Sequence, residues 1–431
     1  MPLPSLSRAF TKRNRIYNLS KNLNLCLCSK KHISSLNIRR VYPDSGYYKT
    51  YFELGLTTSL RDLFLRHRMN KATQRILFLV PYPLGIAPSQ RFRFEQYFDK
   101  LPEAGFEFDV KPFLDERVML YLYDSGNFFR KVWKVKLGLL KRFFQLFTLG
   151  KYDYVFIHRE AAAIGPPIFE WLITKVFRKK VIFDFDDAIW LKNTSSTNSV
   201  ISLFKRYRNA ENVCSWAWKV SCGNDYLANH AKQFNQNVVV NPTTIDTENL
   251  HNRIRQFSEG KITIGWTGTH STIKYLDSLI PILKKLETEF DFNFLVIADR
   301  EPEFEFKNLQ FLPWNKQTEI DDLLKMDVGV MPLEDDKWAK GKCGFKALQY
   351  MALGIPAIVS PVGVNTKIVD HNANGWICNT EVEWEQTLRQ ILEKQIELST
   401  FSEAARTKIK KHYSVKSNTS NFLHLFANNK A

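Results

Sequence analysis

The sequence predicts an α/β protein in which two Rossmann-like domains face each other. Short continuous apolar runs recur along the chain, and each is followed by a loop and a stretch with helical periodicity. Such runs are typical of parallel strands that are buried on both faces of a sheet. The pattern occurs on both sides of residues 241–244, and 431 residues are too many for one ordinary core. We therefore expect two domains of the same class.

The first domain is expected to span residues 71–245. Its first strand is the apolar run 76–80, which ends at a turn containing two prolines and Gly85. A helix is expected to begin near Ser89, because aromatic side chains follow that residue at helical spacing. The other strands expected in this domain are 106–110, 154–157 and 181–183.

The second domain is expected to span residues 246–400, with 401–431 forming a C-terminal helix that packs back on the first domain. Apolar residues recur at helical spacing over 273–286, where Pro281 should kink the helix or divide it. The strands expected in this domain are 262–265, 294–297, 328–331 and 357–359. The alternation of strand and helix indicates a doubly wound sheet.

Residues 1–70 are a basic extension that we expect to lie outside the fold. Residues 1–68 hold thirteen lysines and arginines against three acidic residues, a balance of +10, so +7 of the net charge of +17 is left for the other 363 residues. The extension is rich in Arg and Ser, like a transit peptide, but it is also explained as disordered or as the product of an upstream start codon before Met69. The low charge of the remainder, with no recognised nucleic-acid module, predicts no nucleic-acid partner.

The cysteines and the apolar runs bound the location of the protein. The spacing of the six cysteines suggests neither a disulfide framework nor a zinc site, so a reducing compartment fits. No apolar stretch is long enough to span a bilayer. We expect a cytoplasmic protein, with possible membrane association at the inner face.

Residues 128–149 predict a basic amphipathic helix. The segment has no acidic residue, and six bases alternate with apolar side chains. Such a helix can lie on an anionic membrane, which would make the protein a peripheral membrane protein. The alternative is a surface helix whose apolar side joins the domain core.

The stretch 340–356 is the richest in candidate functional residues. A small, basic loop leads to Gly344, a helix follows, and Gly354 is placed to end that helix. The first turn of a helix attracts anions through its free N–H groups and its dipole. Lys346 and Gln349 lie three residues apart on one helix face, where a cation and an amide suit a diphosphate and a ribose.

The sequence resembles the group 1 (family 4) glycosyltransferases in six motifs that occur in the family's order. The segment 342–354, followed by Ser360-Pro361-Val362-Gly363, is similar to the family's donor motif. The other matching blocks are Ser89-Gln90-Arg91-Phe92-Arg93, His158-Arg159-Glu160, Asp184-Phe185-Asp186-Asp187-Ala188, Pro242-Thr243-Thr244-Ile245-Asp246 and Gly265-Trp266-Thr267-Gly268. The resemblance covers about residues 75–415.

This resemblance implies the GT-B fold, with a cleft between two Rossmann-like domains, and a retaining transfer of sugar from a nucleotide-diphospho-sugar. The acceptor would be a glycan or a lipid-linked glycan, and neither a cofactor nor an obligatory metal is implied. The catalytic candidates are His158, Lys274 and Lys346. The candidates for donor binding are Gly268, Trp314, Gly344, Phe345 and Gln349, and those on the acceptor or phosphate side are Gly85 and Arg91.

The sequence departs from the family at two points. Many members carry a Glu-x7-Glu pattern near the donor, but the matching positions here are Gly341 and Gln349. Many also offer an Arg and a Lys to the diphosphate after the first strand of the donor domain, and here only Lys274 is present. Lys346 is then the expected second cation.

Two alternatives remain open at this point. Asp184-Phe185-Asp186 matches a D-x-D motif, which could hold a divalent metal, although a structural or acceptor-side role for Asp184 and Asp187 is the other interpretation. The missing Glu pair also leaves room for a non-catalytic sugar-nucleotide-binding or scaffold protein.

The composition of the extension yields a first prediction. A protein that begins at Met69 should be soluble and should keep the melting temperature of the full chain, because the first expected strand begins only at Ile76. Thermal unfolding of the two proteins side by side tests this. A large fall in melting temperature on truncation would show that the extension belongs to the fold.

Overall fold

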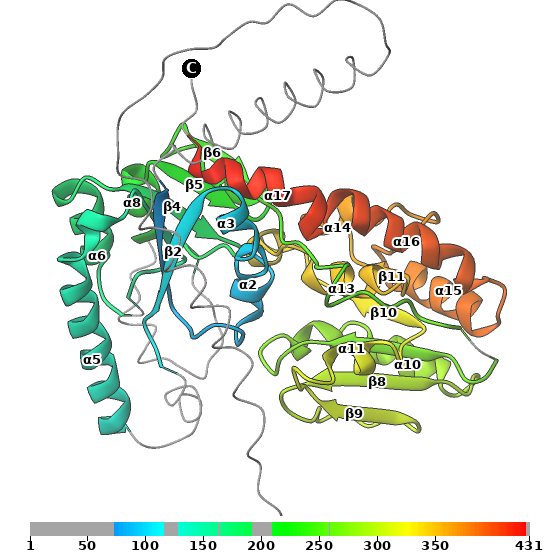
Figure 1. Ribbon diagram of the computed structural model, residues 1–431. Coiled ribbons are helices and arrows are strands. Elements are labelled where there is room, and N and C mark those ends of the chain that lie inside the picture. The colour runs from blue at the N-terminus through cyan, green and yellow to red at the C-terminus, as the bar shows by residue number, and fades with distance from the viewer. Residues whose placement is uncertain (1–72, 116–127, 163, 192–208, 258, 428–431) are drawn as a thin grey trace, which may run out of the picture. The chain divides into compact units, whose positions relative to one another are not determined.

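The computed structural model describes residues 73–115, 128–162, 164–191, 209–257 and 259–427. Residues 71–431 form one compact unit, and the extension expected over residues 1–70 lies outside the described residues. Two six-stranded sheets make up the described part, and helices flank both (Figure 1).

The first sheet is parallel throughout and has the order β2-β1-β3-β4-β5-β6. The order reverses between β1 and β3, so the loops that follow these two strands leave the sheet on either side of a crevice, where open α/β sheets bind ligands. The strands are β1 (Gln74–Val80), β2 (Phe106–Pro112), β3 (Tyr154–His158), β4 (Lys180–Phe185), β5 (Lys219–Cys222) and β6 (Val238–Val240).

The second sheet is also parallel and has the order β12-β11-β10-β7-β8-β9, with its reversal between β7 and β10. The loop that carries Gly268 follows β7, at the carboxyl edge where a ligand is expected. The strands are β7 (Thr263–Thr267), β8 (Asn293–Ala298), β9 (Leu309–Pro313), β10 (Val328–Met331), β11 (Ala357–Val359) and β12 (Gly375–Ile377).

The two parallel sheets confirm the predicted fold class. All eight strands predicted from apolar runs are present, and β5, β6, β9 and β12 are additional. Three of the additional strands lack a clear apolar run, since β5 begins with Lys219, β9 is not buried and β12 has only three residues. β6 is a run of only three valines. Their pairing comes from the tertiary structure rather than from a local pattern.

One predicted helix is broken into pieces. The single helix expected from Ser89 is replaced by α2 (Pro88–Arg91), η1 (Glu95–Tyr97) and α3 (Lys100–Glu103). Phe94 has φ −138°, which no helix allows, and the break follows the buried residue Arg93. The division expected at Pro281 is present, because η5 (Ile273–Leu276) is separate from α10 (Ile280–Leu286), whose first turn accommodates the proline.

The remaining helices cover the faces of the two sheets. In the first half they are α5 (Phe128–Leu146), η2 (Leu149–Lys151), α6 (Ile168–Trp171), η3 (Leu172–Val176), α8 (Asn209–Trp216) and α9 (Asp225–Ala231). In the second half they are α11 (Glu319–Leu323), α12 (Lys337–Lys340), α13 (Phe345–Ala352), α14 (Asn365–Ile368), α15 (Glu381–Leu392), α16 (Leu398–His412), α17 (Val415–Leu423) and η6 (His424–Phe426). None of the described helices is long and apolar enough to cross a membrane.

The chain returns to the first sheet at its C-terminal end. α16 packs in the core of the second sheet through Ala405 and Ile409, whereas α17 and η6 pack in the core of the first. Phe422 of α17 stacks on Tyr97 with ring centroids 4.4 Å apart. The two crossings between the domains pair with each other, since Ile245 exchanges backbone hydrogen bonds of 2.8 and 3.0 Å with residues 413 and 415.

Candidate functional site

The loops at the carboxyl edges of the two sheets contact each other. Arg91, which follows β1, donates from Nη2 to Glu319 Oε2 at 2.6 Å, and Gln349 donates from Nε2 to Glu319 Oε1 at 3.1 Å. The three side chains are 8%, 5% and 2% exposed. Because Arg91 belongs to the first domain and its two partners to the second, this buried contact ties the domains together beside α13.

The loop before α13 is held on the first domain by one asparagine. The amide nitrogen of Asn224 donates to the carbonyl oxygens of Lys340, Gly341 and Lys342 at 3.3, 3.1 and 2.9 Å. The amide oxygen of Asn224 accepts from Leu227 N and so caps α9. A residue that lies between β5 and α9 therefore also fixes the basic loop of the second domain.

Gly344 sets the direction in which α13 begins. Its φ is +67°, a left-handed conformation that favours glycine, and a Cβ there would meet Ile368. The first N–H groups of α13 have no acceptor within the helix, as in any helix. They lie in the turn that carries Phe345 and Lys346, at the positive end of the helix dipole.

Three lysines gather around two aromatic rings near this turn. The Nζ atom of Lys346 lies 5.4 Å from the centroid of the Trp266 ring, and those of Lys342 and Lys274 each lie 5.5 Å from that of Tyr275. Burial, assisted by Lys342, lowers the pKa of Lys346 to about 7, against an opposing effect of Asp187. Within the described part of the chain, none of the three lysines forms an ion pair with a carboxylate. The cluster therefore has cationic charge that a bound anion would stabilise.

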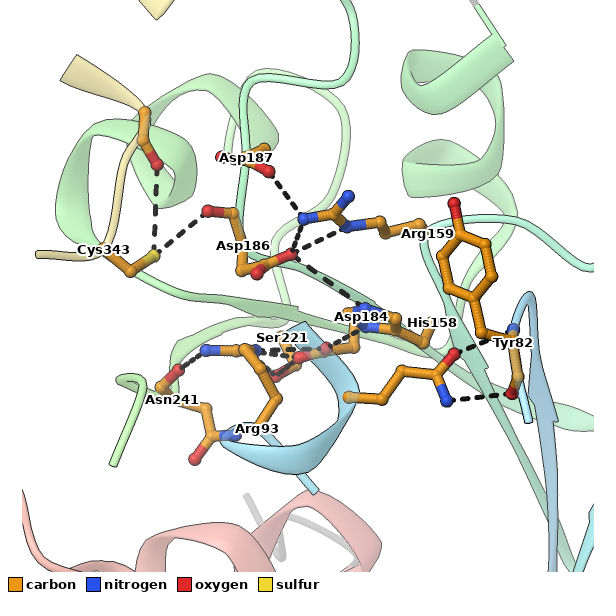
Figure 2. A network of polar contacts seen from close by, with 12 residues as sticks. Tyr82, Arg93, His158, Arg159, Asp184, Asp186, Asp187, Ser221, Asn241 and Cys343 are labelled. Atoms are coloured by element: carbon orange, nitrogen blue, oxygen red, sulfur yellow. Dashed lines mark hydrogen bonds and ion pairs between the residues drawn. The ribbon is translucent and has the colours of Figure 1, made fainter. Parts of the chain in front are cut away.

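A buried polar network lies at the carboxyl edge of the first sheet (Figure 2). Arg93 donates to both carboxylate oxygens of Asp184 and to the carbonyl oxygen of Asn241, and Ser221 donates to Asp184 at 2.6 Å. Burial alone would raise the pKa of Asp184, but Arg93 and His158 outweigh it and hold that pKa below its usual range. Asp184 is therefore a charged group inside the fold, stabilised by Arg93.

Asp184 also orients His158, which is fully buried at the end of β3. The Nδ1 atom of His158 lies 2.8 Å from Asp184 Oδ2. Because the ionised Asp184 can only accept, Nδ1 carries a proton, and Nε2 is an acceptor when the ring carries that proton alone. Nε2 has no hydrogen-bond partner among the described residues and lies 4.0 Å from Asp186 Oδ1. This nitrogen can accept a hydrogen bond from a ligand hydroxyl.

Arg159 gathers the acidic residues that follow β4. Its guanidinium donates to Asp186 Oδ1 at 2.8 Å and to Asp187 Oδ2 at 2.5 Å, and its own φ is +59°. A non-glycine residue in the left-handed region is strained, and such strain clusters at functional sites. Burial raises the pKa of Asp187 although Arg159 opposes the shift. The thiol of Cys343 donates to the carbonyl oxygen of Asp186 at 3.2 Å, which joins this loop to the basic loop of the second domain.

The other predicted residues lie around these contacts. Gly85 has φ +77°, and its N–H donates to Glu95 at 2.8 Å. Gly268 lies against the Trp266 ring, Trp314 lies 6.0 Å from the Arg91 guanidinium, and Phe345 packs on Phe92 with ring centroids 4.5 Å apart. Lys346 and Gly268 thus share the Trp266 ring, and Lys274 lies at the Tyr275 ring. Arg91 and Gln349 contact Glu319, and Trp314 lies beside Arg91. Phe345 contributes to packing between the domains.

The D-x-D motif is engaged by arginines. Asp184 is paired with Arg93 and Asp186 with Arg159, at 2.7 Å in the second pair. Within the described part of the chain, no three His, Cys, Asp or Glu side chains converge as a metal site would require. The carboxylates that would bind a metal are thus used as partners of cations.

Several residues of this site were not found by sequence reasoning. Arg93 and Asn224 act through partners 91 and 118 residues away, and no local pattern reveals such pairs. Glu319 begins α11 and reads as an ordinary acidic residue of a first helical turn. Lys342 alone gave a usable signal, since it lies two residues before Gly344 in the basic loop.

Comparison with known proteins defines the class. Two parallel six-stranded sheets flanked by helices agree with the fold of the GT-B glycosyltransferases. Residues 246–408 match the model of the family described as glycosyl transferases group 1. The resemblance stated from the motifs is confirmed. No curated protein matches the sequence as a relative.

Solved structures support the fold over most of the chain. Sucrose-phosphate synthase from Thermosynechococcus elongatus is 11% identical with a TM-score of 0.60, over 82% of this chain and 98% of that chain. A glycosyltransferase from Rickettsia africae is 14% identical with a TM-score of 0.56, over 82% and 97%. HepE from Anabaena in complex with UDP is 14% identical with a TM-score of 0.53, over 81% and 99%. The family and the fold together support sugar transfer as the reaction.

The lowered pKa of Lys346 predicts that nucleoside diphosphate binding depends on pH. A bound diphosphate stabilises the ammonium, so affinity should be full below pH 7 and should fall above it by up to about tenfold per pH unit. The same proton on Lys346 also makes the stability of the ligand-free protein depend on pH. Stability should fall from about pH 10.5 towards pH 7, because the unfolded chain binds the proton in this range and the folded chain does not. Titration calorimetry with UDP across this range measures the first effect.

Lys346→Arg is the matched control, since a guanidinium stays charged and should flatten the profile. An affinity of the unmodified protein that does not change between about pH 6.5 and about pH 8.5, a range that begins near the pKa of Lys346 and extends above it, would contradict the assignment of Lys346.

Proposed function

We propose that the protein is a retaining glycosyltransferase that moves a sugar from a nucleotide-diphospho-sugar to a glycan or a lipid-linked glycan. The observation that carries the proposal is the cluster of Lys274, Lys342 and Lys346 at the Tyr275 and Trp266 rings. Lys346 lies in the first turn of α13, and none of the three forms an ion pair with a carboxylate in the described part of the chain. A diphosphate supplies the anionic charge that such a cluster lacks, and the N–H groups of α13 supply donors.

In the proposed reaction this cluster stabilises the leaving group. The acceptor hydroxyl approaches the anomeric carbon from the face that the diphosphate leaves, a carbon–oxygen bond to the acceptor forms, and the bond to the phosphate breaks. The departing phosphate oxygen takes the acceptor proton, so no nucleophile of the protein is required. Lys274 and Lys346 are positioned before the reaction, and preorganised charges of this kind are among the largest contributions to catalysis.

His158 is proposed to contact the donor sugar. Its Nε2 atom is a buried acceptor without a partner in the described residues, and Asp184 fixes the ring through Nδ1. A sugar hydroxyl is a donor of suitable chemistry for this nitrogen. Gln349 is proposed to contact the ribose, with its Nε2 held by Glu319 so that its amide oxygen faces the hydroxyls.

Structures of HepE from Anabaena hold UDP, UDP with glucose, and UDP-glucose. We take a UDP-sugar as the first donor to test here. We also place the protein in the cytoplasm with peripheral contact to the inner face of a membrane, which the free thiols of the described cysteines and the basic segment 128–149 support.

The second candidate is a non-catalytic sugar-nucleotide-binding protein, which the absence of the Glu-x7-Glu pattern favours. The structure supplies a physical reason for one departure, because a Cβ at Gly341 would lie 2.8 Å from the Cβ of Ala188 and 2.9 Å from its nitrogen. For the other, Glu319 lies beside Gln349 and is a carboxylate at the same place. Close packing on the first domain thus accounts for the change at position 341 without loss of the site.

A thermal-shift screen of nucleotide sugars tests both candidates. A ligand that binds the folded state raises the melting temperature, and the donor should give the largest rise. The ligand found in this way is then incubated with the protein, and release of the free nucleoside diphosphate is measured. Binding with release supports the transferase, whereas binding without release, with any glycan tried as acceptor, supports the second candidate.

Lys346→Met is predicted to be well folded and nearly inactive. Methionine keeps an apolar chain over Trp266, so the fold should be retained. Losing one preorganised cation should cost about 2–4 kcal/mol of transition-state stabilisation. This corresponds to a fall in kcat/KM of about thirty-fold to a thousand-fold, measured with the donor from the screen.

Binding of the nucleoside diphosphate should weaken in the same variant, with little change for the nucleoside. Lys410→Met, which removes an exposed lysine from α16, serves as the control and should leave both quantities unchanged. Normal turnover and normal nucleoside diphosphate affinity in Lys346→Met would place the donor site elsewhere.

The proposed transfer needs no divalent metal, because lysines and N–H groups neutralise the diphosphate. Activity should therefore persist in excess chelator, measured as release of the nucleoside diphosphate. Complete loss of activity that Mn²⁺ restores would assign Asp184 and Asp186 a metal-binding role instead.

A further inference from the structure

The helix α5 is apolar on two sides. On the inner side Gly138 lies against the Phe113 ring, and Leu146 belongs to the core of the first sheet. On the outer side and directly after the helix, six large apolar residues are 38–69% exposed: Val132, Trp133, Leu140, Phe143, Phe144 and, after α5, Phe147. Packing in the domain core, which was the alternative explanation of this segment, therefore accounts for the inner side only.

Exposed apolar side chains also occur on α6, on η3 and directly after η3. Ile168, Trp171, Val176 and Phe177 are 38–54% exposed. α5 and α6 cover the same side of the first sheet (Figure 1), and Leu146 of α5 and Phe169 of α6 line one small cavity. We call these ten side chains the α5–α6 face. They are ten of the fourteen exposed large hydrophobic residues in the described part of the chain, so the apolar surface is concentrated here.

Among the described side chains of α5, α6 and η3, the exposed charged ones are basic. Lys136 and Lys141 are exposed on α5, and Lys175 and Arg178 are exposed on or just after η3. The acidic residue of α6, Glu170, is 4% exposed and accepts from Ala161 N inside the fold. Arg142 was expected among the exposed bases, but it is 2% exposed because its guanidinium donates to the carbonyl oxygens of Ala161, Lys111 and Val80.

We propose that the α5–α6 face binds the surface of an anionic lipid bilayer. Aromatic and aliphatic side chains enter the boundary between headgroups and acyl chains, and the lysines and Arg178 contact anionic headgroups. A second copy of the chain fits this face less well, because an isologous contact would bring the same lysines together. Bilayer binding involves only the α5–α6 face. It is separate from the proposed sugar transfer, which takes place at the donor site.

The face is joined to the candidate site by a short segment. His158 ends β3, and the chain then runs through residues 159–167 to Ile168, the first residue of α6. A bilayer bound to this face would present a lipid-borne acceptor to the first domain, on which acceptor-side residues were predicted.

Co-sedimentation with lipid vesicles tests the proposal. The full chain should sediment with vesicles of phosphatidylcholine and phosphatidylglycerol, bind pure phosphatidylcholine vesicles much more weakly, and be released by added salt. Lys136→Gln/Lys141→Gln should bind the anionic vesicles about thirtyfold more weakly, because each substitution removes one positive charge from the anionic surface. Phe144→Ser/Phe147→Ser should abolish binding. These side chains are exposed, so the variants should keep the melting temperature.

Lys410→Gln/Lys411→Gln and Val382→Ser are the matched controls, because these residues are exposed in the second half of the chain. Both should bind the vesicles like the unmodified protein. Equal binding to neutral and anionic vesicles, no binding, or the same loss in the controls would overturn the proposal. So would a dimer in sedimentation velocity that Phe144→Ser/Phe147→Ser dissociates. The melting-temperature rise with the donor is measured in parallel and should be the same in all variants, so a failure of lipid binding is distinct from a failure of the donor site.

Discussion

The buried ion pair of Arg93 with Asp184 organises the carboxyl edge of the first sheet. Arg93 lies where the segment after β1 departs from helical geometry, and Asp184 lies in β4, so the pair fixes this segment against the sheet. The same carboxylate holds His158 and Ser221. Removing one partner of such a pair leaves an uncompensated charge inside the fold, which typically costs about 3–5 kcal/mol. Orientation of His158 therefore depends on the same contact that stabilises the domain.

The second domain depends on that edge for the position of its basic loop. Asn224 follows β5 and holds residues 340–342 by their carbonyl oxygens, and Cys343 donates to the loop after β4. The turn with Lys346 is thus placed by contacts to the other domain as well as by Gly344. A change in the relation of the domains would move the cation cluster relative to His158. Binding of a donor that contacts both would stabilise this relation.

The charge of Lys346 is only partly compensated inside the fold. Asp187 faces Arg159, and its charge reaches Lys346 only as a weaker opposing effect on the pKa. Lys346 consequently keeps a preference for an anion. On the outer face of α5, large apolar side chains lack a packing partner and are exposed next to basic ones. The charge of Lys346 thus indicates an anionic ligand, and the exposed apolar side chains indicate a binding surface.

The sequence alone determined the fold class, because strands buried on both faces of a parallel sheet must be apolar runs, and eight of them were visible. It also located the turn at Gly344 and Lys346, since a left-handed glycine before a helix and a nearby cation are local features. The tertiary structure decided the partners. Glu319 meets Arg91 across 228 residues, and Arg142 turns inward although its neighbours face solvent. Such contacts depend on how distant strands align, and no short stretch of sequence contains that information.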